Sequence, residues 1–347
     1  MIKNNEDLKS LCLKISKSNY VAIDTEFKRT STYFPLLCLI QVATDELLEV
    51  IDPLFITSFQ PFIKLLENHE ITWIFHSARQ DLEVIFTKFH TLPKRIFDTQ
   101  IAANFLNFDY QISYQAIIKK VFNHKLEKKY TRIDWSKRPL PKGAIEYAAD
   151  DVRYLLQLKN LLEENLISEK KLDWAKEDFK SILKQNLYQP DIFEGWKKVK
   201  GFSKIDKNKY QYAFAISAWR EQCAIKRNKP RKWILKDEQI LIFLTGNFLL
   251  NETNKQDLDS FCEHFKEKIN NFKFNKKMNI LSKSESEQKK HLQSSLVAIA
   301  NQYNLKPEVL FNKKSIINFI KTRQKANFLS GWRYSLLKEE LLKWETF

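Results

Sequence analysis

Four acidic residues and one tyrosine stand at spacings that could build a hydrolytic site. Asp24 and Glu26 follow an apolar run, and alternate residues of a strand point to the same face, so their carboxylates are expected side by side. Asp81 stands where a strand-like segment gives way to a helical pattern. Tyr147 and Asp151 are four residues apart, which places them on one face of a predicted helix.

If the four carboxylates converge, some must be protonated or neutralised by cations, because like charges raise one another's pKa. Two divalent ions would neutralise the cluster, and oxygen ligands of this kind suit Mg²⁺ or Mn²⁺. Two such ions about 4 Å apart form the arrangement that catalyses in-line phosphoryl displacement. Tyr147, one turn before Asp151, is placed to hold and orient the attacking water.

Each of these features alone also has an ordinary structural explanation. The Asp-x-Glu pair could be a turn or a helix cap, and Asp81 could be a helix N-cap. Tyr147 and Asp151 could face solvent on an amphipathic helix. Their order along the chain, and the elements in which they stand, favour a shared site over three separate coincidences.

The first half of the chain alternates strand-like and helix-like segments. Short apolar runs predict strands at 20–24, 36–43, 47–53 and 72–77, and the close spacing of the first three is typical of an antiparallel meander. Helical patterns follow at 81–90, 99–106, 114–123 and 143–166. Strands followed by helices indicate an α/β domain with a mixed sheet covered by helices.

Beyond about residue 170, strand signals largely vanish and amphipathic helices dominate. Helices are predicted at 209–227, 237–249, 258–272, 294–303, 314–322 and 334–345. Polar stretches near 200–208 and 274–291 are interpreted as linkers or loops. The second half is therefore expected to form one or two small all-α modules.

The positive charge is concentrated in that second half. The chain carries a net charge of +16, and residues 191–347 contribute 31 Lys and Arg against 17 Asp and Glu, a net of +14. Residues 1–190 contribute 27 against 25, a net of +2. A basic region of this size indicates a polyanionic partner, with nucleic acid favoured over a membrane.

Several classes of site are excluded by composition. No apolar run approaches the roughly 20 residues of a membrane span, and the polar N-terminus predicts a soluble, non-secreted, cytoplasmic protein. The four cysteines form no Cys-x-x-Cys pair, and the histidines show no ligand spacing, so we expect free buried thiols and no zinc site. Glycine-rich phosphate loops are absent.

The segments IDTEFKRTSTYFPLLCLIQVA, FHSARQDLEVI, RIDWSKRPL and YAADDVRYLLQL resemble the exonuclease motifs of the ribonuclease D family. That family is the tyrosine-type (DEDDy) branch of the DEDD 3′–5′ exonucleases, and the resemblance covers about 20–160. It implies a ribonuclease H-like fold. It also implies that Asp24, Glu26, Asp81 and Asp151 are the metal ligands and that Tyr147 positions water.

Neighbouring polar residues are assigned other roles. The Tyr-x-x-x-Asp motif selects Asp151 and leaves Asp150, which should point elsewhere because it lies 100° away around the helix. Arg132, Asp134 and Trp135 match a further family signature, and a structural salt bridge and a core tryptophan are preferred for it. His76 and Asp98 are interpreted as packing and turn residues.

After residue 190, WREQCAIKRNKPRKWILKDEQILIFL is similar to the helicase-and-ribonuclease-D C-terminal (HRDC) domain. LSGWRYSLLKEELL near the end resembles the tail of the ribonuclease D family. Together these resemblances imply an exonuclease domain over 1–170, a helical linker over 171–205, an HRDC-like domain over 206–285 and a second, degenerate HRDC-like domain over 286–347.

The resemblance to the ribonuclease D family implies an exoribonuclease that trims the 3′ ends of tRNA precursors and other small structured RNAs with two divalent ions, releasing nucleoside 5′-monophosphates. We expect it to be a monomer. A DNA exonuclease of repair is the first alternative, because these motifs do not display contacts to the 2′-OH. A non-catalytic RNA-binding protein on the same scaffold is the second. A basic helical adaptor is the third.

Overall fold

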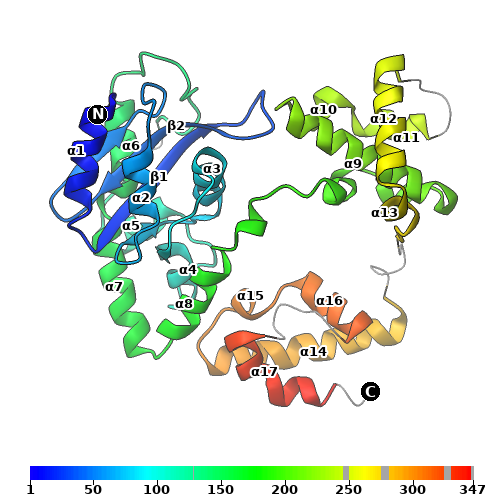
Figure 1. Ribbon diagram of the computed structural model, residues 1–347. Helices are drawn as coiled ribbons and strands as arrows, with labels where there is room; N and C mark the ends of the chain where they lie inside the picture. Colours follow the sequence, from blue (N-terminus) through cyan, green and yellow to red (C-terminus); the bar gives the residue numbers. More distant parts are fainter. Residues whose placement is uncertain (128, 245–249, 275–280, 324–329, 345–347) are drawn as a thin grey trace. The chain divides into compact units, whose positions relative to one another are not determined.

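The computed structural model describes residues 1–127, 129–244, 250–274, 281–323 and 330–344 (Figure 1). The chain divides into two compact units. The first unit contains Met1–Lys28, Leu37–Tyr188 and Met278–Phe347, and the second unit contains Arg29–Leu36 and Gln189–Lys277.

A mixed five-stranded sheet forms the centre of the first unit. Its strands are β1 (Tyr20–Lys28), β2 (Leu36–Ala43), β3 (Leu48–Ile51), β4 (Thr72–Phe75) and β5 (Arg95–Asp98), in the order β3-β2-β1-β4-β5. β2 and β3 are antiparallel, whereas β4 runs parallel to β1, and β5 parallel to β4. The predicted mixed sheet is confirmed, and β5 is a strand that the sequence analysis did not predict.

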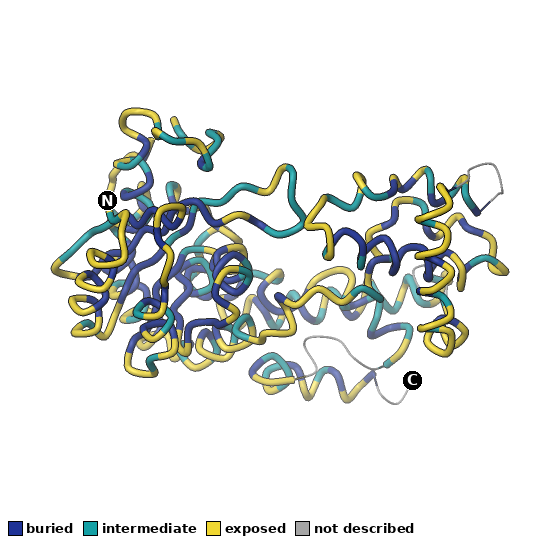
Figure 2. Tube along the Cα trace, turned by 45° about the horizontal axis from the view of Figure 1, so that its top comes forward, coloured by how far each residue is buried: buried dark blue, intermediate teal, exposed yellow. Residues whose placement is uncertain are grey.

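Eight α-helices accompany this sheet in the described part of residues 1–188. They are α1 (Asn5–Ile15), α2 (Gln60–Leu66), α3 (Arg79–Phe89), α4 (Thr99–Asn104), α5 (Tyr114–Phe122), α6 (Ala144–Arg153), α7 (Leu155–Ser168) and α8 (Leu172–Ser181). Strands β2 and β4 are buried along most of their length, and β1 is buried at residues 21–23 and 25. Figure 2 shows the buried segments of the chain in dark blue. Ile23, Trp73 and Phe75 are fully enclosed. Burial of such large apolar side chains is the main favourable contribution to the stability of this core.

The single helix predicted over 143–166 is in fact two helices. α6 ends at Arg153 and α7 begins at Leu155, with Tyr154 between them outside helical geometry (φ −104°, ψ 0°). The backbone N–H of Tyr154 donates to the hydroxyl of Tyr114 at 3.3 Å. A side chain from α5 therefore inserts into the helical hydrogen-bond ladder, which is a recognised cause of a helix break.

Further helices in the first unit follow residue 282: α14 (Lys283–Gln302), α15 (Pro307–Leu310), α16 (Lys313–Thr322) and α17 (Gly331–Leu342). The loop predicted over 274–291 is wrong from Lys283 onward, because Ser282 and Glu285 form a reciprocal capping box that starts α14. Residues 275–280 of that prediction lie outside the described residues. Arg333 on α17 binds Asp178 on α8 with two hydrogen bonds of 2.6 and 2.8 Å.

The second unit is helical throughout its described residues. Its α-helices are α9 (Tyr210–Lys226), α10 (Arg231–Ile234), α11 (Asp237–Phe243), α12 (Glu252–His264) and α13 (Lys266–Asn270), preceded by short 3₁₀ turns over Ile192–Lys198, Phe202–Lys204 and Lys207–Lys209. α9 is its buried centre. Arg220 on α9 forms a buried ion pair of 2.7 Å with Asp237 on α11. The helix predicted over 237–249 ends at Phe243, and 245–249 lie outside the described residues.

Two expectations from composition can also be compared with the structure. No helix formed by the described residues is long and apolar enough to cross a lipid bilayer. None of the four cysteines, all of which lie in the described residues, forms a disulfide; three are buried as expected, and Cys262 is half-buried.

Candidate active site

Strand β1 presents the first two carboxylates of the candidate site. Asp24 and Glu26 lie in the second half of β1 and are both partly buried, while Thr25 between them is buried. The hydroxyl of Thr25 donates a 2.6 Å hydrogen bond to Oδ1 of Asp81. The sequence analysis missed Thr25, although its position between two acids was a usable signal.

Helix α3 supplies the third carboxylate. The N-cap of α3 is Ala78, so Asp81 is not the cap but lies in the first turn, with only 7% of its surface exposed. A negative charge in a first turn is favoured by the partial positive charge of the helix N-terminus. Together with the Thr25 hydroxyl, this position holds a buried carboxylate that would otherwise be costly.

Helix α6 carries Tyr147 and Asp151, which are one turn apart as predicted, and it packs against β1 and β3. Gly143 precedes the helix with φ +87°, and a Cβ there would lie 3.0 Å from the hydroxyl oxygen of Tyr130. Glycine therefore suits both the left-handed backbone and the close approach of Tyr130. The start of α6, and with it the placement of Tyr147, depends on this turn.

The pKa values show that the four carboxylates influence one another. The pKa of Asp24 is raised well above its usual range, first by burial and then by the charges of Asp81, Asp151 and Glu26. Burial, followed by Asp151 and Asp81, raises the pKa of Glu26 to about 8. Burial is also the largest cause that raises the pKa of Asp81 and of Asp151 to about 7. The structure therefore brings the four predicted acids into one electrostatic cluster.

The oxygen donors of this cluster match the chemistry of hard divalent cations. Within the described residues, however, no group of three or more His, Cys, Asp or Glu side chains is already arranged to hold a metal ion. Carboxylates in a buried cluster repel one another, and both separation and protonation relieve that repulsion. The carboxylate oxygens of the cluster are thus suitable ligands for divalent ions. Their arrangement around such ions stays a prediction.

Tyr147 is held by a hydroxyl and by aromatic rings. Its hydroxyl lies 3.0 Å from Oγ1 of Thr131. Its ring stacks on Trp135 with centroids 6.3 Å apart and meets the edge of Tyr130 at 5.8 Å. Burial is the main reason that the pKa of Tyr147 is raised, so the phenol stays protonated at neutral pH. Thr131 was also missed, and nothing in its sequence context distinguishes it from a surface loop residue.

Asp150 is engaged outside the cluster, as expected. Its carboxylate accepts a 2.7 Å hydrogen bond from Nε of Arg153. Its negative charge is still felt by Asp151, whose pKa it helps to raise. Asp150 therefore affects the cluster through the electrostatic effect of its charge on the pKa of Asp151, while its side chain is bound to Arg153.

The segment around Trp135 contains the salt bridge and the buried tryptophan that the sequence analysis preferred for it. Asp134 forms a 2.8 Å ion pair with Lys28 at the end of β1, so its partner is not Arg132. Trp135 is buried beneath Tyr147. A further ion pair that the sequence analysis missed joins Arg138 to Asp52 with bonds of 2.6 and 2.7 Å.

His76 and Asp98 are packing and turn residues, as predicted. The His76 ring lies 2.9 Å from the Thr99 hydroxyl through Nδ1 and 2.9 Å from the Ile112 carbonyl through Nε2. Asp98 caps α4 by accepting from the backbone N–H groups of Gln100 and Ile101.

Comparison with known proteins identifies the family. Residues 1–167 match the family profile described as 3′–5′ exonuclease. Ribonuclease D of Nitrobacter hamburgensis is 34% identical over 242 residues, a match that covers 69% of this chain but only 63% of that protein. Ribonuclease D of Desulfotalea psychrophila is 30% identical over 360 residues, covering 98% of this chain and 96% of that protein.

A solved structure agrees over the full length. The crystal structure of Escherichia coli RNase D, described as an exoribonuclease involved in structured RNA processing, superposes with a TM-score of 0.85 at 25% identity. The superposition covers 99% of this chain and 97% of that one. On the strength of the fold, the exonuclease profile and a relative matched from end to end, the chain belongs to the ribonuclease D family.

Proposed function

We propose that this protein is a metal-dependent 3′–5′ exoribonuclease that trims the 3′ ends of tRNA precursors and other small structured RNAs. The single observation that carries the proposal is the buried cluster of Asp24, Glu26, Asp81 and Asp151, with Tyr147 one turn from the last acid. Family membership supports the direction of cleavage, and the description of the E. coli relative supports RNA as the substrate.

The four carboxylates would hold two divalent cations, Mg²⁺ or Mn²⁺. When bound, such ions activate water and stabilise the developing charge on the departing 3′ oxygen. The raised pKa values of Glu26 and Asp151 support this need for cations. Without bound cations, ionised carboxylates in the cluster would repel one another at neutral pH. Thr25 would keep the Asp81 carboxylate in place through its hydrogen bond.

Tyr147 would orient the attacking water. A neutral phenol can both donate and accept a hydrogen bond, so it can hold a water molecule in one orientation. Thr131 at 3.0 Å and the stacked ring of Trp135 restrict the position of the Tyr147 hydroxyl. This restriction supports a positioning role, since a mobile hydroxyl would contribute little to orientation.

RNA would be held by basic helical regions, and we propose the HRDC-like boundaries 206–285 and 286–347 for them. The second unit carries 20 Lys and Arg against 11 Asp and Glu, a net charge of +9. Such a charge favours phosphate contacts that do not depend on base sequence. We further propose that the protein acts as a monomer.

The direct test is a time course on a 3′-extended tRNA precursor with Mg²⁺, with Mn²⁺ or with EDTA. Stepwise shortening from the 3′ end with release of 5′-monophosphates is expected only with metal, and Asp24→Asn is the inactive control. A matched DNA 3′ overhang tests the first alternative, because faster turnover of DNA would point to a DNA exonuclease. Binding of RNA without hydrolysis at any metal concentration would point to a non-catalytic protein.

A further inference from the structure

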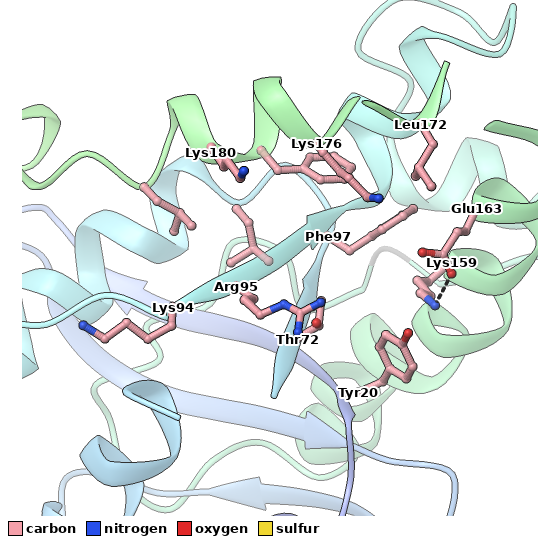
Figure 3. A pocket seen from close by; sticks show the side chains of 13 residues that line it. Tyr20, Thr72, Lys94, Arg95, Phe97, Lys159, Glu163, Leu172, Lys176 and Lys180 are labelled. Carbon is pink, nitrogen blue, oxygen red and sulfur yellow. Dashed lines mark hydrogen bonds and ion pairs between the residues drawn. The ribbon is translucent and has the colours of Figure 1, made fainter. Parts of the chain in front are cut away.

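A second concave site lies at the opposite end of the parallel strands from the carboxylates. A pocket of about 350 Å³ is lined by Tyr20, Thr72 and Arg95, the first residues of β1, β4 and β5 (Figure 3). Helices α7 and α8 complete its wall. Asp24 stands four residues further along β1, which at about 3.3 Å per residue is about 13 Å away. The pocket is therefore separate from the candidate active site.

The lining of this pocket is strongly basic. Its cations are Lys94, Arg95, Lys159, Lys176 and Lys180, and its one acid is Glu163. A net positive lining of this size in a concave surface concentrates anions near it.

Glu163 neutralises one of these cations only. Lys159, with 3% of its surface exposed, pairs with Glu163 and lies over the Tyr20 ring, 3.7 Å from its centroid. Lys176 is 3.7 Å from Asp173, whose side chain is 95% exposed, and such a surface pair contributes little. Among the described residues no carboxylate forms an ion pair with Arg95.

Cations from three elements line the same pocket. They are Lys159 on α7, which is paired with Glu163, Lys176 on α8, and Arg95 on β5, which also donates to the backbone carbonyl of His69 at 3.4 Å. Figure 3 shows the side chains of Lys176, Arg95 and Lys159 along the pocket, with the side chain of Phe97 drawn between Lys176 and the other two. Lys176 and Lys180 are also one turn apart on α8, a spacing at which like charges repel. An anion bound between these groups would relieve the repulsion and accept several charge-assisted hydrogen bonds.

We propose that this pocket binds the phosphate group of a nucleotide, either free or within an RNA strand. The volume lies within the range of small-ligand pockets. The part-exposed ring of Tyr20 and the buried ring of Phe97 add an aromatic wall beside the cations, which suits a ribose and base better than an inorganic ion. The site does not depend on hydrolysis at the carboxylate cluster.

The test compares two double variants of the full-length chain in EDTA, which removes any nucleotide binding that depends on metal. The pocket variant is Arg95→Ala with Lys176→Ala, which removes one cation from each wall. The control is Lys9→Ala with Lys64→Ala, which removes the same charge from exposed positions on α1 and α2. The probes are inorganic phosphate, 5′-AMP and a short oligonucleotide with 2′-O-methyl riboses, each measured by calorimetric titration.

The pocket variant should lose about tenfold or more in affinity for each cation removed, the contribution of a hydrogen bond to a charged group, while the control stays within about twofold. A larger loss of affinity for 5′-AMP than for the oligonucleotide in the pocket variant, each relative to the control variant, identifies a free nucleotide as the ligand, and the reverse identifies RNA. The charge-conserving pair Arg95→Lys with Lys176→Arg should retain most of the affinity, which separates lost charge from lost folding. Equal losses in pocket and control variants, or the absence of saturable binding by every probe, would overturn the proposal.

Discussion

At the scale of single residues, we expect the proposed metal ligands Asp24 and Asp151 to favour the reaction at some cost to the stability of the fold. Replacing either by Asn should abolish hydrolysis, because one of four proposed ligands is removed. The same change removes an ionisable group from a cluster in which burial first, and then three neighbouring acids, raise the pKa of Asp24. The thermal midpoint in EDTA should therefore hold or rise. Near-normal turnover by either variant at saturating Mg²⁺ would contradict the proposed ligand set.

Tyr147→Phe removes one hydroxyl and keeps the ring that stacks on Trp135. If this hydroxyl orients water, kcat should fall by roughly 10²–10⁴, the range for positioned proton-handling groups, with RNA affinity almost unchanged. Thr131→Val, which removes the hydrogen bond to Tyr147 but not the phenol, should have a smaller effect of the same kind. A loss of affinity with unchanged kcat would instead identify Tyr147 as a substrate contact.

The raised carboxylate pKa values predict how stability depends on pH without metal. A carboxyl whose pKa is higher in the folded than in the unfolded chain binds its proton more tightly when folded. Its contribution to stability is complete below the unfolded pKa of about 4. That contribution is lost as pH rises through about 7 for Asp81 and Asp151 and about 8 for Glu26.

The thermal midpoint in EDTA should accordingly fall as pH rises from about 4 to about 8, between the unfolded and the raised folded pKa values, and scanning calorimetry across that range measures it. Asp151→Asn should make the fall shallower, because it removes one of the titrating groups. Saturating Mg²⁺ should also reduce it, since bound cations favour the charged carboxylates. A midpoint that rises with pH in EDTA would show that these pKa values are not raised in solution.

At the scale of elements, the sequence was informative where periodicity carried the signal. The structure places Asp24 and Glu26, two residues apart, on strand β1, as their spacing predicted. It places Tyr147 and Asp151, four residues apart, on helix α6. β5 was missed because Arg95 and Asp98 occupy two of its four positions, which leaves a single apolar pair as its signal. The break at Tyr154 was missed because it depends on Tyr114, a tertiary partner 40 residues away. Thr131 was missed for the same reason.

The segment Arg29–Leu36, which follows β1 in the chain, belongs to the second unit. The side chain of Asn228 accepts hydrogen bonds from the backbone N–H groups of Tyr33 and Phe34 at 3.1 and 3.0 Å. The Tyr33 hydroxyl donates to Glu221, and Arg231 binds the same carboxylate. Glu221 thus joins the segment to the helices of the second unit.

Glu221→Ala should destabilise the second unit by about 1–3 kcal/mol, because it leaves partly buried donors on Tyr33 and Arg231 without their acceptor. Urea unfolding followed by tryptophan fluorescence gives the change in free energy. Glu263→Ala is the matched control, since its exposed pair with Lys266 should contribute less than about 1 kcal/mol. Equal losses in the two variants would show that Glu221 has no special role in holding this segment.

At the scale of the whole molecule, the C-terminal helices of the first unit pack against its N-terminal part. Trp332 on α17 packs against Phe105 and Trp174, with ring centroids 5.3 and 5.1 Å apart. A fragment ending near residue 190 would lack Trp332, expose the rings of Phe105 and Trp174, and lose the Arg333–Asp178 ion pair. The contribution of the basic helices to RNA binding is therefore better measured by neutralising charges in the full chain than by truncation.

Residues 226–233, from the last residue of α9 through the turn and into α10, are the most direct place for such a measurement. Trp233 is 62% exposed there, and the ammonium group of Lys229 lies 5.6 Å from its ring centroid. Lys226, Arg227 and Lys232 are exposed beside it in sequence. Exposed aromatic rings among cations are typical of surfaces that stack bases and bind phosphates.

Neutralising Lys226, Arg227, Lys229 and Lys232 to Gln should raise KM for the tRNA precursor and leave kcat nearly unchanged, because these side chains would bind the RNA equally well in the ground and transition states. The slope of log K against log salt should become shallower by up to about 3, at about 0.7 for each single-stranded phosphate that the variant no longer neutralises. The control replaces Lys9, Lys14, Lys17 and Lys64, exposed lysines of the first unit, so that net charge is matched. If both quadruple variants change the slope equally, RNA responds to the overall charge of the protein, and residues 226–233 do not form a binding surface.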